Sequence, residues 1–198
     1  MKKTGIMGGT FNPVHYAHLA LAQCAMEQYE LDEVIFMTSG NPPHKRNIDM
    51  PDAKIRHEML KIALEGKEKF VADDYEVNLT EYSYSVNTMK HLHEKMSECE
   101  LYFIIGGDSL RDLPKWYKPH ELMKLCTLLV YPRDNEDISD EISEMQNKFG
   151  GEIYPVKAPV MDVSSTDIRR RIKAGESVLG MLPKGVGEYI IEHKIYSV

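Results

Sequence analysis

Short apolar runs alternate with longer amphipathic segments along most of this chain. The short runs predict strands over residues 2–8, 34–37, 101–105, 127–131 and 153–154. Apolar residues at helical spacing predict helices over 13–29, 52–65, 85–97, 138–148, 165–174 and 184–193, with short helical pieces around 116 and over 119–125. Strands that alternate with helices are typical of α/β proteins with a mostly parallel sheet covered on both faces. We therefore expect a doubly wound α/β fold, in which ligands bind at the carboxyl ends of the strands.

The length of 198 residues is sufficient for one compact domain with a hydrophobic core. The sequence contains no internal repeat, low-complexity tract or clear linker. We therefore expect a single domain over residues 1–198, with the C-terminal helical segment from about residue 164 packed on it.

Composition and cysteine usage favour a cytoplasmic protein. No apolar run reaches the ~20 residues that span a bilayer, and the apolar stretch after Lys2 and Lys3 is too short for a signal peptide. Cys24, Cys99 and Cys126 form no C-x-x-C pair, which is typical of reduced core cysteines without a metal. We expect no membrane association.

The formal net charge of −7 argues against a general affinity for nucleic-acid backbones. Small phosphorylated ligands remain compatible with this charge. A phosphate site in such a protein has to be built locally, from individual cations and helix N-termini.

The loop after the first predicted strand carries the most informative pattern. Two glycines at 8–9 allow a ligand to approach the backbone closely. Asn12 and Pro13 are typical of an N-cap and a first helical residue. His15 and His18 then lie three residues apart on one helical face, near a helix N-terminus that favours anions. Imidazole donors in this place could stabilise the charge that develops in phosphoryl or nucleotidyl transfer, and would do so more strongly when protonated.

This loop matches neither of the common nucleotide-binding loops and is a poor zinc site. The sequence has neither a G-x-G-x-x-G fingerprint nor a G-x-x-x-x-G-K-S/T phosphate loop. Zinc is disfavoured, because the helix has no H-E-x-x-H motif and no third ligand nearby. A purely structural role would fit either histidine alone better than it fits the pair in this setting.

A second candidate anion site lies near the C-terminus. Ser164 and Asp167 have the spacing of a capping box at a helix start. The hydroxyls at 164–166 and the guanidinium of Arg169 could converge on one anion. Alone, this stretch would fit a well-capped amphipathic helix equally well. Together with the first loop, it could clamp a polyphosphate at the switch point of the sheet.

The two segments, G-G-T-F-N-P-x-H-x-x-H over 8–18 and S-S-T-x-I-R over 164–169, resemble the two signatures of nucleotidyltransferases with an H-x-G-H motif. The pattern is most similar to that of the bacterial nicotinate-mononucleotide adenylyltransferases. The resemblance extends in order along the chain, through Pro42-Pro43-His44-Lys45, Tyr84-Ser85 with Thr88, 105–109, Trp116-Tyr117 and 186–196. It implies a Rossmann-like nucleotidyltransferase fold.

The resemblance also implies roles for individual residues. It places His15, His18 and Arg169 at the reacting phosphates as catalytic residues. The remaining ATP contacts would come from Gly8, Gly9, Thr10, Phe11, Gly106, Asp108, Ser165 and Thr166. The position of Arg133, after a predicted strand end and Pro132, suggests a further contact with the adenine or a phosphate of ATP. The mononucleotide would contact Lys45 and Arg46 through its phosphate, Trp116 through its pyridine ring, and also Tyr84, Ser85 and Tyr117.

The implied reaction joins ATP and nicotinate mononucleotide to deamido-NAD and pyrophosphate, with Mg²⁺ carried by ATP and not by protein side chains. The attacking phosphate is already ionised near neutral pH, so direct in-line attack needs no general base. The sequence accordingly shows no nucleophile beside a base.

Several alternatives stay open at this stage. The acceptor could be nicotinamide mononucleotide or phosphopantetheine, the nucleotide could be CTP, or the chain could sense nucleotides without turnover. Ala17 stands where the motif has glycine, which favours the helix and adds a methyl group near the phosphates. Arg56 fits a solvated residue as well as a ligand contact, and a homodimer is compatible with the sequence.

Overall fold

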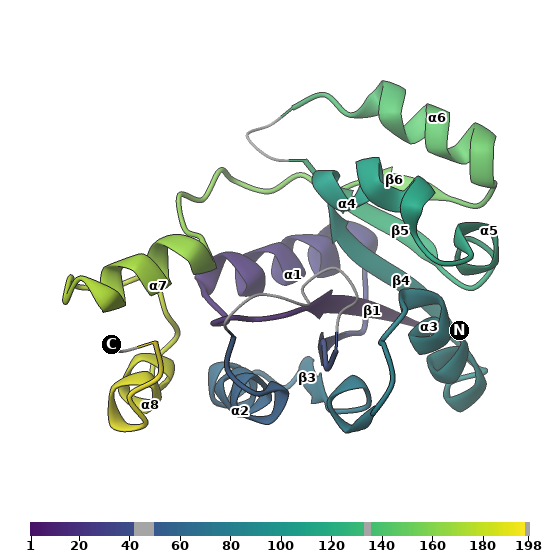
Figure 1. Cartoon of the computed structure of the whole chain (residues 1–198). Helices are drawn as coiled ribbons and strands as arrows, with labels where there is room; N and C mark the ends of the chain where they lie inside the picture. The colour runs from purple at the N-terminus through teal and green to yellow at the C-terminus, as the bar shows by residue number, and fades with distance from the viewer. Residues whose placement is uncertain (42–49, 133–135, 197–198) are drawn as a thin grey trace.

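The computed structural model describes residues 1–41, 50–132 and 136–196. Its strands form one parallel sheet with the order β3-β2-β1-β4-β5-β6 (Figure 1). The strands are β1 Lys2–Gly9, β2 Glu33–Thr38, β3 Phe70–Asp73, β4 Cys99–Gly106, β5 Thr127–Tyr131 and β6 Ile153–Pro155. The strand order reverses direction between β1 and β4, which confirms the predicted doubly wound α/β fold.

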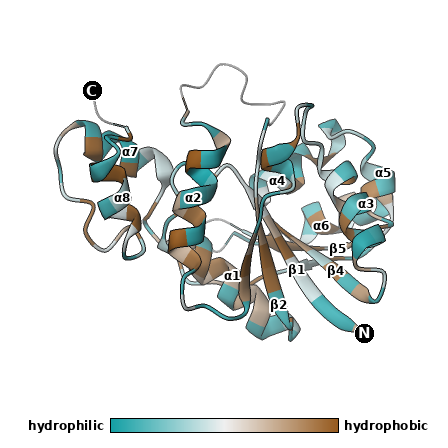
Figure 2. Cartoon of the chain, turned by 90° about the horizontal axis from the view of Figure 1, so that it is seen from below, coloured by the Kyte–Doolittle hydropathy of each residue, from teal (hydrophilic) through white to brown (hydrophobic). Residues whose placement is uncertain are grey.

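Helices cover both faces of this sheet. They are α1 Tyr16–Tyr29, α2 Ala53–Leu64, α3 Ser85–Lys95, α4 Gly107–Asp112, α5 Pro119–Leu122, α6 Ser139–Phe149, α7 Ser165–Lys173 and α8 Val186–Glu192, with 3₁₀ turns η2 Glu76–Asn78 and η3 Leu113–Lys115. Neighbouring strand residues point to opposite faces, so Met7 joins the core under α1 and α2 while Ile6 joins the core under α3 to α6. The strands at the centre of the molecule are accordingly hydrophobic (Figure 2).

The C-terminal helices pack on the first of these two cores. Ile168 of α7 and Val186 and Ile190 of α8 belong to the same buried cluster as the residues of α1 and α2. Figure 1 shows α7 and α8 at the opposite end of the molecule from α5 and α6. Residues of the segment from about residue 164 thus share a buried cluster with α1 and α2, and the single domain over 1–198 stays a prediction.

The sequence pattern did not predict β3. This strand has four residues and pairs only with β2, at the edge of the sheet. Its Val71 is 41% exposed, so the strand lacks the continuous apolar run that marks a buried strand.

The predicted start of the first long helix was wrong. We expected Asn12 as its N-cap, but α1 begins at Tyr16 and its N-cap is His15. The Asn12–Pro13 peptide bond is cis, and the Asn12 side chain accepts a hydrogen bond from Tyr196 instead of from a helical N–H. The partner of Asn12 therefore lies at the other end of the chain.

The predicted cap of α7 is half confirmed. The Ser164 side chain accepts a hydrogen bond from the main-chain N–H of Asp167 at 3.1 Å. The Asp167 carboxylate forms ion pairs with Arg170 and Arg171 and does not complete the box.

The three cysteines are free thiols. Cys126 is buried, and Cys24 and Cys99 are half-buried against the two cores. In the described residues, no helix is long and apolar enough to cross a membrane.

Candidate active site

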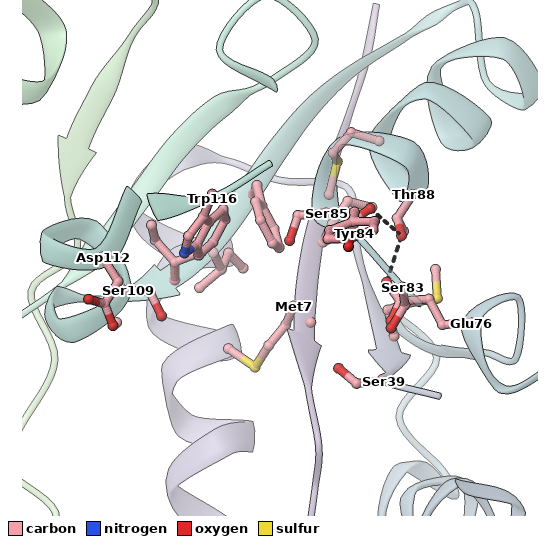
Figure 3. Close-up of a pocket in the computed structure, with 18 of the residues that line it drawn as sticks. Met7, Ser39, Glu76, Ser83, Tyr84, Ser85, Thr88, Ser109, Asp112 and Trp116 are labelled. Atoms are coloured by element: carbon pink, nitrogen blue, oxygen red, sulfur yellow. Dashed lines mark hydrogen bonds between the residues drawn. The ribbon is translucent and has the colours of Figure 1, made fainter. Parts of the chain in front are cut away.

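A cleft of about 1070 Å³ opens at the carboxyl ends of β1 and β4, where the strand order reverses. Gly8 at the end of β1 and Gly106 at the end of β4 form part of its wall. His18, Tyr84 and Trp116 line it from α1, the start of α3 and the segment after α4. Figure 3 shows Trp116 and Tyr84 at the wall of this cleft, with Met7 of β1 between them in the view. The cleft is therefore where a doubly wound sheet places its ligand.

The first turn of α1 fixes the orientation of His18. The main-chain N–H of His15 donates to Nδ1 of His18 at 3.2 Å. An imidazole nitrogen that accepts a hydrogen bond carries no proton, so neutral His18 has its proton on Nε2. His18 can therefore act as an Nε2–H donor toward a ligand in the cleft that it lines.

The buried side chain of His15 packs against the ring of His18. Its side chain is 6% exposed, and its ring stacks on the His18 ring with 3.7 Å between the centroids. Burial lowers the pKa of His15 to about 4. The His15 imidazole is therefore neutral near pH 7, which removes the protonated form that we considered as a stronger phosphate donor. Its Nδ1 is buried without a hydrogen-bond partner among the described residues.

The loop before α1 is shaped by Gly9 and Phe11. A Cβ atom on Gly9 would lie 3.1 Å from the Phe11 ring, which is closer than most side chains allow. Phe11 has a positive φ of 45° and is 1% exposed, with its ring at 5.1 Å from the His18 ring. A ligand could thus meet Phe11 only through its main chain.

The second motif lies directly on this loop. Ser165 Oγ donates to the Pro13 carbonyl at 2.9 Å, and Arg169 Nη1 donates to the Asn12 carbonyl at 2.7 Å. Arg169 Nη2 also donates to Thr166 Oγ1 at 3.3 Å. The expected proximity of the two motifs is therefore confirmed, and part of their hydrogen-bonding capacity joins them to each other.

Arg56 is not the solvated residue that we considered as one of its two possible roles. It is 1% exposed and therefore not solvated. Its guanidinium donates to the carbonyls of Thr10 at 2.6 Å, Ser39 at 2.8 Å and Pro51 at 3.0 Å. This buried cation ties the ends of β1 and β2 to the start of α2, and burial lowers its pKa.

The four expected mononucleotide residues that the structure describes all line the cleft. They are Tyr84, Ser85, Trp116 and Tyr117. The ring centroids of Tyr84 and Tyr117 lie 4.8 Å apart, and those of the half-buried Trp116 and Phe103 lie 6.2 Å apart. Helix α3 begins at Ser85 without a side-chain cap, so its first main-chain N–H groups can face an anionic group.

Other expected ligand residues are placed differently. Asp108 is not among the residues that line the cleft, and its carboxylate contacts Arg111 at 3.4 Å. Lys45, Arg46 and Arg133 lie outside the described residues. In the described part of the chain, no group of three or more His, Cys, Asp or Glu residues could hold a metal ion.

Comparison with known proteins agrees with this geometry. Residues 6–171 match the family model described as cytidylyltransferase-like. A probable nicotinate-nucleotide adenylyltransferase of Lachnoclostridium phytofermentans is 39% identical over 199 residues, which cover 99% of this chain and 100% of that protein. A protein of the same name from Clostridium novyi is 41% identical over 187 residues, covering 93% of this chain and 94% of its own. The chain belongs to this nucleotidyltransferase family.

A solved structure supports the fold assignment. The nicotinic acid mononucleotide adenylyltransferase of Plasmodium falciparum, complexed with NaAD, superposes with a TM-score of 0.82 at 19% identity. The match covers 99% of this chain and 98% of that one. The shared arrangement includes the C-terminal region beyond residue 171.

The site also contains residues that the sequence did not indicate. Ser39, Glu76 and Asp112 line the cleft, as does Ser109, which belongs to the 105–109 segment of the resemblance but was given no role. Glu76 is 8% exposed and accepts a hydrogen bond from Thr88 Oγ1 at 2.6 Å (Figure 3). Burial raises the pKa of this carboxyl group. Glu76 begins the 3₁₀ turn η2 shortly after the end of β3, so its position could not be found without the strand that the pattern missed.

Proposed function

We propose that this nucleotidyltransferase joins Mg-ATP and nicotinate mononucleotide to deamido-NAD and pyrophosphate. The observation that carries the proposal is one cleft lined both by His18, whose Nδ1 accepts from His15, and by Trp116 with the uncapped start of α3. The first feature suits a phosphate group, and the second suits a flat ring that bears a carboxylate. The names of the bacterial relatives point to the same pair of substrates.

In this reaction, a phosphate oxygen of the mononucleotide attacks the α-phosphorus of ATP. A new P–O bond forms to that oxygen while the bond to the bridging oxygen of pyrophosphate breaks. The protein supplies no nucleophile, and it acts by aligning the two phosphates and by stabilising the charge that develops. His18 donates from Nε2 to a phosphate oxygen in the transition state. Mg²⁺ enters with ATP as part of that substrate.

The start of α3 gives a physical reason to prefer nicotinate over nicotinamide. The free N–H groups and the dipole at a helix N-terminus favour a carboxylate over a neutral amide. Trp116 offers a face on which the pyridine ring can stack. Lys45 and Arg46, as residues for the mononucleotide phosphate, and Arg133, for ATP, stay predictions from the sequence, as do a cytoplasmic location and a homodimer.

The experiment that tests this proposal is pyrophosphate release from Mg-ATP with separate acceptors. Nicotinate mononucleotide, nicotinamide mononucleotide and phosphopantetheine are each offered to the same preparation. We expect turnover with nicotinate mononucleotide to exceed turnover with the other two. Faster turnover with phosphopantetheine would overturn the proposed acceptor. ATP binding without pyrophosphate release from any acceptor would support a nucleotide sensor instead.

A further inference from the structure

Distant parts of the chain hold the loop that leads to His15 and His18. Arg56 Nη1 donates to the Thr10 carbonyl at 2.6 Å, and Arg169 Nη1 donates to the Asn12 carbonyl at 2.7 Å. These bonds restrain the main chain of the loop from α2 and from α7. They do not restrain the Asn12 side chain, which is 5% exposed and points away from solvent.

The last described residues of the chain supply the missing restraint. Tyr196 Oη donates to Asn12 Oδ1 at 2.7 Å, across 184 positions in sequence. The carbonyl of Met181, in the same C-terminal region, accepts from the main-chain N–H of Tyr16 at 3.2 Å. The C-terminal segment therefore contacts both ends of the stretch from Asn12 to Tyr16.

Packing holds Tyr196 in place for this contact. Its neighbour Ile195 is 7% exposed and belongs to the buried cluster that includes Val186 and Ile190 of α8. Burial raises the pKa of Tyr196, although the nearby cations oppose that shift. The hydroxyl therefore keeps its proton near neutral pH and remains a hydrogen-bond donor there.

Displacement of Asn12 would reach the catalytic histidine directly. Val14 is fully buried, and Asn12 and His15 are 5% and 6% exposed, so residues 12–15 form a closely packed stretch. A packed stretch of this kind shifts as a unit, because it has no void into which one residue could move alone. The N–H of His15 at its end holds Nδ1 of His18.

We propose that Tyr196 is a positioning residue for adenylyl transfer, which fixes the loop carrying His15 and His18 through its hydrogen bond to Asn12. Asn12 lies within residues 6–171, which match the family model, and Tyr196 lies beyond them. The kinetic part of the inference rests on the proposed function. The structural part does not.

The test is the variant Tyr196→Phe, which removes the hydroxyl and keeps the ring. Tyr189→Phe is the matched control, because Tyr189 lies on α8 in the same segment and stacks on His193 instead of contacting the loop. Amide hydrogen exchange of residues 10–16 is measured first, since it needs no substrate. We expect exchange at His15 and Tyr16 to become at least about tenfold faster in Tyr196→Phe and to stay unchanged in Tyr189→Phe.

Steady-state kinetics then separate positioning from general stability. We expect kcat of Tyr196→Phe to fall about tenfold or more, with both KM values changed less than about threefold. A displaced loop misaligns the reacting groups and so lowers the rate, but it leaves most contacts that bind the substrates in place. Combining Tyr196→Phe with Asn12→Ala should lower kcat no further than Asn12→Ala alone, since the two residues act through one bond.

Two results would overturn the inference. One is a Tyr196→Phe variant with the exchange rates and kcat of the Tyr189→Phe control. The other is a lower melting temperature with unchanged kcat, which would make Tyr196 a purely structural residue. If the wild-type protein does not use nicotinate mononucleotide, the proposed function fails, and the exchange measurement still decides the role of Tyr196.

Discussion

The main-chain N–H of His15 donates to Nδ1 of His18 at 3.2 Å, and the two rings stack with 3.7 Å between their centroids. The sequence motif implied the same phosphate-binding role for both histidines, but the structure gives them different positions. His15 is the N-cap residue of α1 and is buried, whereas His18 lines the cleft. Protonation of His18 at Nδ1 would break the bond that orients it, so the proposed donor to a phosphate is Nε2–H.

The variant His18→Ala tests this donor. We expect kcat to fall by about 10²–10³, as for other lost transition-state donors, while the Kd for ATP changes less than about threefold. Pyrophosphate release and a direct ATP titration measure the two quantities. His93→Ala serves as the control, because His93 is exposed in the last turn of α3. Near-normal turnover of His18→Ala would exclude the assigned role.

The buried His15 predicts a loss of stability in acid. Its pKa is lowered from 6.5 to about 4, so between these values the unfolded chain binds a proton that the folded chain does not. The free energy of unfolding therefore falls as the pH decreases from 6.5 toward 4. At 1.36 kcal/mol per pKa unit, the loss from this group is roughly 2 kcal/mol by pH 5.

Urea unfolding at pH 7 and pH 5 measures this effect in the wild type and in His15→Gln. The variant should lose roughly 2 kcal/mol less between the two pH values, because it lacks the titrating imidazole. Glu76, whose pKa is raised by burial, contributes with the opposite sign but is present in both proteins. Equal pH dependence of the two proteins would show that His15 titrates normally.

The buried guanidinium of Arg56 predicts a large effect of a conservative change. Arg56→Lys keeps the charge but cannot reach the carbonyls of Thr10, Ser39 and Pro51 together, because an ammonium lacks the planar fork. We expect the free energy of unfolding to decrease by about 2–4 kcal/mol, since buried carbonyls lose their donors. Urea unfolding measures this free energy. The control is Arg170→Lys, at an exposed ion pair, which should change the free energy of unfolding by no more than about 0.5 kcal/mol. A loss as small as that of the control would mean that water replaces the guanidinium.

Much of this fold could be predicted from local pattern. The strand β5, with its buried run over Leu128 to Val130, was predicted with the bounds that the structure has. The edge strand β3 was not, because pairing on one side leaves it half-exposed and shortens its apolar run. Because β3 was missed, Glu76 was missed too: it lies shortly after this strand, in the 3₁₀ turn η2, and lines the cleft.

The site shows the same division between local and distant causes. The proximity of the two motifs was predicted, and the bonds from Ser165 and Arg169 to the first loop confirm it. The prediction of Asn12 as an N-cap was wrong because the Asn12 side chain bonds to a residue 184 positions away. The burial of Arg56 was equally beyond local pattern, since its acceptors are carbonyls, which any residue carries.

Trp116 offers an optical test of how the cleft is occupied. It is the sole tryptophan of the chain and lines the cleft half-buried, so its fluorescence reports on this place alone. We expect nicotinate mononucleotide to quench this fluorescence, and Trp116→Ala to raise the KM for the mononucleotide about tenfold or more, because stacking of a base on an aromatic ring contributes about 1–3 kcal/mol. The KM for ATP should change less than about twofold, and Tyr154→Ala, at an exposed ring on β6, should change neither value. A rise confined to the KM for ATP would place the adenosine, and not the pyridine ring, against Trp116.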